Sequence, residues 1–363
     1  MSEAVAPVTR PSADPLQRRA IALVSGGLDS MLAVKVMQEQ GIHVEGVNFF
    51  TGFCVEGHTH AIRKKDKDKN KRNNALWVAE ELGIKLHIID ISEEYKDVVL
   101  NPKHGYGAHL NPCLDCKIFM VNQATLMLNK ARELAGEKGF DFIITGEVVG
   151  QRPKSQRKET MPIISSESGA DDRLLRPLSA LNLPETLPER EGWVDRSRLH
   201  DFSGRNRKPQ IELEDYAQPS GGCCFLTDES YSRKLADLWQ ARNERRYELD
   251  DIMLLKVGRH IRPQPHLKLI ISREEGENRF LEGYRYQFTS LTTVSCPGPL
   301  ALVDGRFESE AELEQAAAIV ARYSKGRGDD TVTVEVKDPG GVAREVRIAP
   351  ARPEDIPKTW LVA

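Results

Sequence analysis

The fold is decided by residues 21–30, which read IALVSGGLDS. Residues 21–24 form a short apolar run, which is typical of a strand buried in a parallel sheet. The next six residues hold two glycines, two serines and one aspartate, and residues 31–37 then place apolar side chains at helical spacing. A strand-to-helix turn of this kind presents backbone N–H groups at the positive end of a helix dipole. It therefore predicts an anion site.

Strands and helices alternate after this turn. Apolar runs predict strands at residues 44–50, 85–91 and 140–145, and amphipathic stretches predict helices at residues 75–82 and 118–135. This alternation predicts an α/β fold with a doubly wound, mostly parallel sheet. Ligands of such sheets bind at the carboxyl ends of the strands.

Length favours a second domain, since 363 residues exceed what one hydrophobic core usually organises and about 150 residues per domain is the usual expectation. Short strands expected at residues 253–257 and 267–271 indicate a smaller α+β domain. We therefore expect a disordered tail at residues 1–19, a first domain at 20–249 and a second at 250–363.

Composition is that of a globular protein, with 40% hydrophobic and 29% charged residues. The sequence has no apolar stretch of the roughly 18 residues that a membrane helix needs, and residues 1–19 hold charges and prolines where a signal peptide holds an apolar core. We therefore expect a cytoplasmic protein without a membrane partner. The net charge of −3 gives no global attraction to nucleic acid, so such binding needs local basic patches. Residues 63–72 (RKKDKDKNKR) are either one such patch or solvated surface.

The turn supplies the groups that a polyphosphate needs. Gly26 and Gly27 allow close backbone approach, Ser25 and Ser30 offer hydroxyl donors, and the carboxylate of Asp29 can hold Mg²⁺ against the phosphates. The lysine of a Walker loop is missing.

The motif SGGLDS after a buried strand resembles the pyrophosphate loop of the PP-loop ATP pyrophosphatases, which have an adenine nucleotide α-hydrolase-like fold. The resemblance implies that the chain binds ATP and Mg²⁺ at this loop, cleaves ATP between the α and β phosphates and adenylates a substrate. This superfamily includes amide ligases, deazaguanine synthases and tRNA sulfur-inserting enzymes, so the loop leaves the substrate open.

Three cysteines form a second group. Cys113 and Cys116 lie in NPCLDCK and Cys224 lies in SGGCCFLTD, whereas Cys54 and Cys296 stand apart. The CxxC spacing lets two thiolates reach one metal ion or form one disulfide, and a distant third cysteine can complete a three-thiolate set. An iron–sulfur cluster with one open iron, a redox pair and a structural zinc site remain alternatives. A closed zinc site would need a fourth ligand, such as the neighbouring cysteine 223 or a histidine.

The cysteine segments resemble those of tRNA-modifying enzymes. NPCLDCK resembles the NPCxxC segment of the tRNA 2-thiouridylases, and Cys224 matches their second essential cysteine. Residues 145–147 (TGE), Gln151 in GQ and residues 176–178 (RPL) resemble positions of the tRNA 4-thiouridine synthetases instead. Those enzymes commonly carry a THUMP domain before the loop, and some carry a cysteine between TGE and RPL, which this chain lacks. The resemblance places Gly146 and Gln151 in the nucleotide site.

The segment after residue 250 resembles a different family. Its GRH and KLI motifs, followed by Arg273 and the pair EN, resemble positions of the NFACT-type RNA-binding domain. The resemblance implies that Arg259, His260, Lys268 and Arg273 grip RNA phosphates. A generic small α+β domain is the alternative.

Together the resemblances imply a tRNA sulfurtransferase that adenylates a uridine carbonyl and inserts sulfur. They make Asp29, Cys113, Cys116 and Cys224 the catalytic residues, with the three cysteines holding a 4Fe-4S cluster. Zn²⁺ at these thiols, or a persulfide on Cys224 resolved by Cys113 or Cys116, stay as alternatives.

The implied partners are tRNA and a sulfur donor, either sulfide or a cysteine desulfurase persulfide. A homodimer is one assembly state that the sequence allows, and both 4-thiouridine and 2-thiouridine fit as products. Two rival functions remain. One is a PP-loop amidating or deazaguanine-forming enzyme that acts on a small molecule and holds structural zinc, and the other is a non-catalytic RNA-binding protein.

Overall fold

The computed structural model describes residues 17–55, 73–133, 139–213 and 224–363. The basic run at residues 63–72 and most of the expected N-terminal tail lie outside these ranges. The chain divides into two compact units. The first unit comprises Met1–Phe49, Asn74–Ile89 and Cys113–Pro219, and the second comprises Phe50–Asn73, Asp90–Pro112 and Ser220–Ala363.

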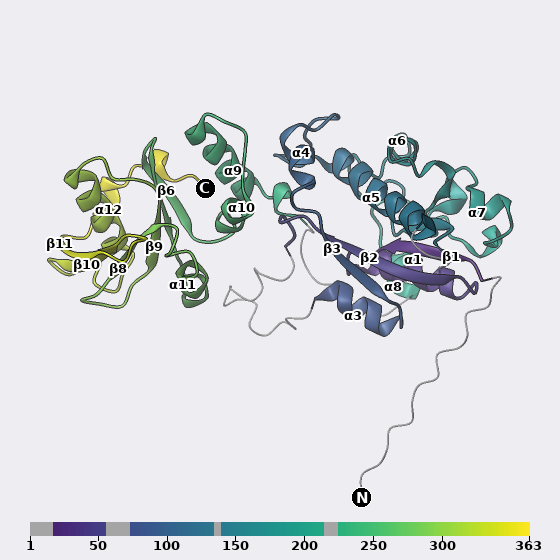
Figure 1. Ribbon diagram of the computed structural model, residues 1–363, viewed down its shortest axis with the longest axis horizontal. Helices are drawn as coiled ribbons and strands as arrows, with labels where there is room; N and C mark the ends of the chain where they lie inside the picture. Colours follow the sequence, from purple (N-terminus) through teal and green to yellow (C-terminus); the bar gives the residue numbers. More distant parts are fainter. Residues whose placement is uncertain (1–16, 56–72, 134–138, 214–223) are drawn as a thin grey trace, which may run out of the picture. The chain divides into compact units, whose positions relative to one another are not determined.

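The first unit is built on a five-stranded sheet in the order β3-β2-β1-β4-β5 (Figure 1). Its strands are β1 (Arg19–Leu23), β2 (His43–Phe50), β3 (Leu86–Asp90), β4 (Phe142–Thr145) and β5 (Leu174–Leu175). Strand β1 pairs in parallel with β2 and β4, and β4 pairs in parallel with β5. This confirms the doubly wound, mostly parallel sheet. Because β1 continues to β2 on one side and borders β4 on the other, the direction of winding changes between β1 and β4, where such sheets bind ligands.

Helices cover both faces of this sheet, with α5 on one side and α3 on the other (Figure 1). The helices of the first unit are α1 (Leu28–Gln38), α3 (Asn74–Glu81), α5 (Cys113–Glu133), α6 (Met161–Glu167), α7 (Leu187–Arg190) and α8 (Lys208–Leu213). Burial on both faces explains why β1 is an unbroken apolar run, since Ala20 and Ile21 are both fully buried. Helix α5 begins at Cys113, earlier than the predicted start at residue 118, so the CxxC motif lies in its first turn.

The second unit contains a six-stranded sheet in the order β11-β10-β8-β9-β7-β6. Its strands are β6 (Arg259–Gln264), β7 (Leu267–Ile271), β8 (Thr289–Thr293), β9 (Leu300–Gly305), β10 (Val332–Lys337) and β11 (Ala343–Ile348), and every neighbouring pair is antiparallel. Its helices are α4 (Tyr95–Leu100), α9 (Glu229–Arg242), α10 (Leu249–Leu254), α11 (Glu275–Glu282) and α12 (Glu310–Arg322). The apolar face of α12, with Leu313, Ala317 and Val320, packs into the core of the sheet. A second unit with an α+β fold is thus confirmed, although it is not the smaller of the two.

The compact units do not divide at residue 250, where the sequence places the boundary. Phe53 contacts Tyr95, Tyr231 and Tyr247 with ring centroids 5.5 to 6.2 Å apart, so segments from before residue 112 share a core with α9. A Cβ on Gly52 would lie 2.6 Å from Ile252 Cδ1. The strand predicted at residues 253–257 is wrong, since residues 249–254 form α10, and the Tyr231 hydroxyl donates to the Ile252 carbonyl oxygen of this helix at 2.9 Å.

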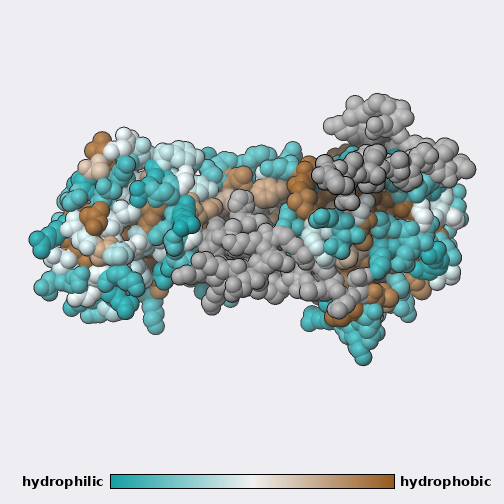
Figure 2. Space-filling view, turned by 90° about the horizontal axis from the view of Figure 1, so that it is seen from below, coloured by the Kyte–Doolittle hydropathy of each residue, from teal (hydrophilic) through white to brown (hydrophobic). Residues whose placement is uncertain are grey.

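Figure 2 shows one face of the molecule coloured by hydropathy. On the part that carries the six-stranded sheet, hydrophilic residues cover most of this face and hydrophobic residues are scattered. Tyr286 and Val342 are the large apolar side chains most exposed in the described part of this unit, at 69% and 72%. Such a surface suits a polar ligand better than an apolar one. Among the described residues, no helix combines the length and the apolar character that crossing a bilayer requires.

Candidate functional site

Two glycines shape the loop that follows β1. Gly26 has a φ of +76°, and a Cβ there would lie 2.7 Å from the backbone nitrogen of Ala75. A Cβ on Gly146, just after β4, would lie 2.4 Å from the carbonyl carbon and oxygen of Asp29. The loop after β1 therefore lies directly against the end of β4, and only glycine fits at either contact. The structure thus brings Gly146 to the loop at the point where the winding changes.

The loop leads into α1, whose N-cap is Gly27. The Ser30 hydroxyl donates to the Gly27 carbonyl oxygen at 2.8 Å, and the Ser25 hydroxyl lies 3.5 Å from that of Ser30. The positive end of the α1 dipole and both hydroxyls therefore belong to one loop, as an anion site requires. These groups fit a polyphosphate.

The Asp29 side chain lies in the first turn of α1 and accepts hydrogen bonds on both carboxylate oxygens. Gln151 Nε2 donates to Oδ2 at 2.7 Å, and Arg207 Nη2 donates to Oδ1 at 3.1 Å. Gln210 Nε2 in turn donates to Gln151 Oε1 at 3.0 Å. Sequence analysis placed Gln151 in the nucleotide site but did not identify Arg207 or Gln210. Their signal is the basic segment GRNRKPQ at residues 204–210, which lies far from the loop in sequence.

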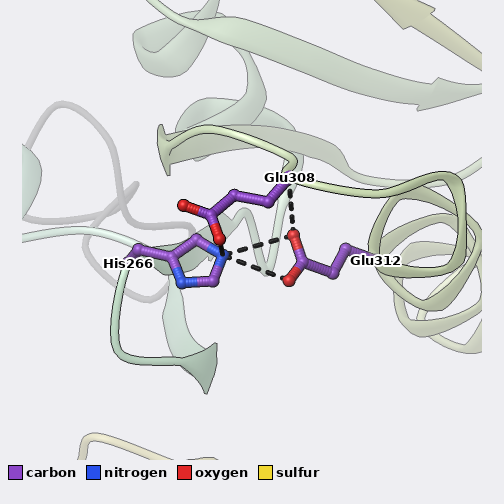
Figure 3. Close-up of side chains that lie close together, drawn as sticks. All are labelled: His266, Glu308 and Glu312. Atoms are coloured by element: carbon purple, nitrogen blue, oxygen red, sulfur yellow. Dashed lines mark hydrogen bonds and ion pairs between the residues drawn. The ribbon is translucent and has the colours of Figure 1, made fainter.

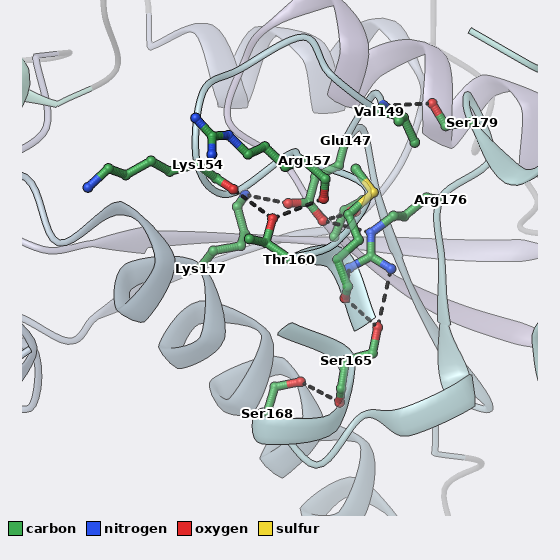
Figure 4. Close-up of polar contacts among 12 residues, drawn as sticks. Lys117, Glu147, Val149, Lys154, Arg157, Thr160, Ser165, Ser168, Arg176 and Ser179 are labelled. Atoms are coloured by element: carbon green, nitrogen blue, oxygen red, sulfur yellow. Dashed lines mark hydrogen bonds and ion pairs between the residues drawn. The ribbon is translucent and has the colours of Figure 1, made fainter. Parts of the chain in front are cut away.

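A buried carboxylate lies beside the loop, at Glu147. Figure 4 shows the side chains of Arg176 and Lys117 pointing toward it. Arg176 Nε lies 3.1 Å from Glu147 Oε2, Lys117 Nζ lies 3.8 Å from Oε1, and the Thr145 hydroxyl donates to Oε2 at 3.0 Å. Burial raises the pKa of Glu147, but the two cations and the hydrogen bonds outweigh it and hold this pKa below its usual value. The TGE and RPL motifs therefore meet in a buried ion pair that fixes the end of β4.

Replacing Glu147 with glutamine should lower the free energy of unfolding by about 3 to 5 kcal/mol, because the Arg176 charge would stay buried without its anion. Urea unfolding measures this change. The exposed Glu159→Gln is the matched control and should cost nothing measurable. Because the folded pKa is lowered, the stabilisation is complete above the unfolded pKa of about 4.5 and is lost as the pH falls through the folded value. An unfolding midpoint equal to that of the wild type would contradict this role.

Cys113 and Cys116 lie one turn apart at the start of α5, so their side chains share one face of the helix. The Cys113 thiol lies 3.2 Å from the Ser155 hydroxyl. The positive end of the α5 dipole favours negative charge at this turn. Two thiolates on one helix face fit as ligands of one metal ion or cluster. Cys224 belongs to the second unit, and the neighbouring cysteine 223 lies outside the described residues.

Cys224 lies opposite Cys54, which sequence analysis set apart. The two residues form an antiparallel bridge, and the Phe225 N–H donates to the Phe53 carbonyl oxygen at 2.9 Å. That bond makes Cys54 and Cys224 the non-hydrogen-bonded pair of the bridge, in which Cα atoms lie about 4.5 Å apart and side chains approach closely. None of the described cysteines forms a disulfide.

A buried lysine accompanies this thiol pair. Lys256 is only 3% exposed, its Nζ lies 3.4 Å from the Cys54 carbonyl oxygen, and the same atom lies 5.2 Å from the Phe225 ring centroid. Burial lowers the pKa of Lys256 to about 8, although the nearby Cys54 and Cys224 thiols act to raise it. A thiolate formed here would therefore face a cation. No sequence motif pointed to this lysine.

Oxidation of the full-length protein by oxidised glutathione should join Cys54 to Cys224, because narrow cross-strand pairs bring two thiols within disulfide reach. Peptide mapping without reductant should recover one peptide pair linked through these residues. The Cys54→Ser variant should yield no such pair. Recovery of a Cys113–Cys116 bridge with Cys54 and Cys224 still open to alkylation would contradict the expectation.

Two of the four residues expected to grip RNA are buried. Lys268 is 1% exposed and its Nζ lies 2.9 Å from Asp304 Oδ2, while His260 is 1% exposed and its Nε2 lies 3.0 Å from the Val257 carbonyl oxygen. Burial, aided by nearby lysines, holds the pKa of His260 well below its usual value. The expectation that His260 and Lys268 contact RNA is therefore corrected. In this structure a buried ion pair and a neutral histidine stabilise the sheet.

The other two expected RNA contacts reach the surface. The Arg273 side chain is 42% exposed, and its Nη2 donates to the Gly258 carbonyl oxygen at 2.8 Å. The Arg259 guanidinium lies 4.8 Å from the Tyr323 ring centroid. Both guanidinium groups are thus oriented by neighbours of the same domain.

One further group of titratable side chains lies at the start of α12. His266 Nε2 lies 3.2 Å from both carboxylate oxygens of Glu312 and 3.9 Å from Glu308 (Figure 3). The three are close enough to hold a metal ion. Glu312 also accepts the Glu308 N–H at 2.7 Å, and Ser309 caps the helix. These contacts are those of a helix start, and we assign no ligand to them.

Comparison with known proteins supports the resemblances to the tRNA 2-thiouridylases and to the NFACT-type RNA-binding domain. Residues 18–173 match the family model of the tRNA methyl transferase HUP domain, and residues 258–361 match that of the NFACT protein RNA binding domain. The chain is 31% identical over 213 residues to a tRNA-specific 2-thiouridylase of Pelobacter propionicus, covering 57% of this chain and 54% of that protein. It is 23% identical over 317 residues to one of Christiangramia forsetii, covering 79% of this chain and 74% of the relative.

A solved 4-thiouridine synthetase–RNA complex with bound ATP is 20% identical, with a TM-score of 0.33 over 66% of this chain and 52% of that one. The chain spans about half the length of the Pelobacter propionicus relative and of a similar enzyme of Syntrophus aciditrophicus, at 54% and 55%.

Proposed function

Since residues 18–173 match a tRNA methyl transferase HUP domain and residues 258–361 match an NFACT protein RNA binding domain, we propose that this chain thiolates tRNA at the expense of ATP. The observation that carries the proposal is the loop after β1, where Gly26 and Gly146 allow the loop to pack closely against neighbouring segments and Asp29 lies in the first turn of α1. The 2-thiouridylase relatives support the choice of tRNA over a small molecule.

In the proposed reaction the loop holds the β and γ phosphates of ATP through its N–H groups and the hydroxyls of Ser25 and Ser30. The carbonyl oxygen of a uridine bonds to the α phosphorus, and the bond from that phosphorus to the bridging oxygen breaks. Pyrophosphate leaves, and the uridine carbon is now bonded to an adenylate leaving group. A sulfur nucleophile then bonds to this carbon, and AMP departs with the original carbonyl oxygen.

Asp29 is the residue that would hold Mg²⁺, which neutralises charge on the departing pyrophosphate. Glu147 does not compete for this ion, because Arg176 and Lys117 already pair with its carboxylate. Glu147 of the TGE motif thus has a structural role, whereas Asp29 of the loop is the residue that would bind the metal ion.

The sulfur route is proposed to use Cys113, Cys116 and Cys224 as three ligands of a 4Fe-4S cluster. Held by these residues, such a cluster would have one open iron, which could bind sulfide from the sulfur donor and deliver it without consuming a cysteine. The helix face shared by Cys113 and Cys116 supports the first two ligands. The alternative of a persulfide on Cys224 is supported by one observation, the Cys54 thiol across the bridge, which can resolve a persulfide as Cys113 or Cys116 would. Zinc at these thiols belongs to the rival small-molecule function.

The second domain is proposed to hold tRNA by its phosphates. Arg259 and Arg273 are the expected contacts that reach the surface, whereas His260 and Lys268 do not. Guanidinium groups bind phosphate oxygens through paired N–H donors, so oriented arginines suit this task.

Replacing Arg273 with glutamine should weaken tRNA binding about three- to tenfold at moderate salt and reduce the slope of log affinity against log salt by about 1, because one phosphate contact is lost. Titrations of labelled tRNA at several salt concentrations measure both values. Arg352→Gln is the control, since this arginine is exposed and ion-paired as Arg273 is, but is not one of the expected RNA contacts. Equal affinity and equal slope for Arg273→Gln and the wild type would place the RNA contacts elsewhere.

The proposed function is tested by release of pyrophosphate and AMP from ATP in the presence of unmodified tRNA. We expect release that depends on tRNA and on Mg²⁺. Release that needs no tRNA but follows addition of a small carboxylic acid and ammonia would favour an amidating enzyme. No release under any condition, together with retained tRNA binding, would favour a non-catalytic RNA-binding protein.

A further inference from the structure

The Asp29 carboxylate has a protein donor on each oxygen. Gln151 Nε2 lies 2.7 Å from Oδ2 and Arg207 Nη2 lies 3.1 Å from Oδ1. The carboxylate is 16% exposed, so it is sheltered but still reachable. A divalent cation binds such a carboxylate at about 2 Å and is repelled by a guanidinium at this distance. Metal cannot therefore reach Oδ1 until Arg207 moves.

Of the two donors, Gln151 is the fixed one. Its side-chain carbonyl accepts a hydrogen bond from Gln210 at 3.0 Å, and Gln210 is fully buried on α8. Moving Gln151 would break this partly buried hydrogen bond as well as its bond to Asp29, and both losses are costly. The Gln151–Gln210 pair thus holds Asp29 in place.

Arg207 is the movable donor. It lies just before α8, its side chain is 26% exposed, and it reaches Asp29 across 178 residues of sequence. A partly exposed arginine can change rotamer without leaving a buried cavity. Asp29 follows directly on the loop, so an anion bound by that loop would lie close to the Arg207 guanidinium.

We propose that Arg207 is a phosphate-binding residue of this loop, paired with Asp29 before ATP binds and with the β and γ phosphates afterwards. Before and after this exchange, both the Arg207 guanidinium and the Asp29 carboxylate have a partner of opposite charge. The guanidinium trades a carboxylate for phosphate oxygens, with which it forms paired hydrogen bonds, and the released carboxylate becomes available to Mg²⁺. This assignment rests on the proposed function only in taking ATP as the ligand of the loop.

Calorimetric titration of the full-length protein with ATP, with no tRNA present, tests the exchange. At saturating Mg²⁺, Arg207→Gln should weaken ATP binding at least tenfold, and Arg207→Lys should recover part of that loss because the charge is kept without the guanidinium fork. At a fixed ATP concentration, the Mg²⁺ concentration that gives half of the maximal binding heat should fall for Arg207→Gln. The reason is that Asp29 no longer pairs with a cation and is free to bind Mg²⁺. The dissociation constant for ATP should thus rise while the half-maximal Mg²⁺ concentration falls, whereas simple damage to the loop would raise both.

Arg205→Gln is the matched control, because this exposed arginine lies two residues earlier on the same segment. It should leave both values unchanged. Wild-type ATP affinity in Arg207→Gln would overturn the assignment while leaving ATP use intact. A parallel rise in both values, with no recovery in Arg207→Lys, would also overturn it and make Arg207 a structural residue. If the wild-type protein itself binds no ATP, the proposed function fails and the assignment falls with it.

Discussion

Asp29→Asn should reduce tRNA-dependent pyrophosphate release about a hundredfold or more, because the amide cannot hold Mg²⁺ against the leaving pyrophosphate and metal stabilisation of that charge amounts to several kcal/mol. Asparagine keeps the shape of the side chain and can still accept a hydrogen bond from Gln151. The variant should therefore fold as the wild type does. Rapid-quench measurement of pyrophosphate at saturating ATP gives the change.

The control for this substitution is Asp201→Asn, an exposed aspartate of the same unit. It should release pyrophosphate at the wild-type rate. Undiminished release from a folded Asp29→Asn protein would remove the pyrophosphate-loop assignment, since no other expected ligand of the loop carries a carboxylate.

Loss of any one of the three thiols should abolish sulfur insertion. Cys113→Ala, Cys116→Ala and Cys224→Ala should each fall below the detection limit, because a three-thiolate set that leaves one iron open does not survive the loss of a ligand. Each variant should keep wild-type affinity for ATP, whose phosphates bind the loop of residues 25–30. Thiolated nucleoside per chain, measured by mass spectrometry after one turnover, reports the first effect. The anaerobically purified wild type should hold about four irons per chain.

The neighbouring cysteine 223 supplies the discriminating control. Its replacement by alanine should leave iron content and sulfur insertion unchanged if Cys224 is the third ligand. If that variant fails and Cys224→Ala does not, the assignment is off by one position. If the protein is colourless and holds one zinc ion, and all four substitutions lower its stability equally, the site is a structural zinc site.

The parts of the fold that could be predicted from the sequence are those determined by the order of apolar and glycine residues within a short segment. The apolar run of residues 21–24 and the glycine turn after it needed only neighbouring residues, and both took the expected form. The sequence did not predict that the compact units are discontinuous, with Phe53 and Tyr95 sharing a core with Tyr231 and Tyr247. Nothing local in those segments indicates that distant partners bury them.

The candidate site shows the same division between local and distant contacts. Loop residues 25–30 could be assigned from one motif, whereas Arg207 lies 178 residues from Asp29 and Lys256 lies 202 residues from Cys54. His260 and Lys268 were expected to contact RNA because the GRH and KLI motifs resemble positions of an RNA-binding domain, and such a resemblance does not show which side chains are buried. All five residues of β7 are buried, and Asp304 on β9 supplies the partner that lets Lys268 lie inside.

Nucleoside analysis of tRNA tests the central claim most directly. Total tRNA from a strain lacking this protein, and from the same strain carrying the wild type or Asp29→Asn, is digested and its thiolated uridines are quantified by mass spectrometry. We expect either 4-thiouridine or 2-thiouridine derivatives to disappear from the deletion strain, to return with the wild type and to stay absent with Asp29→Asn. A full complement of both thiolated uridines in the deletion strain would contradict this expectation.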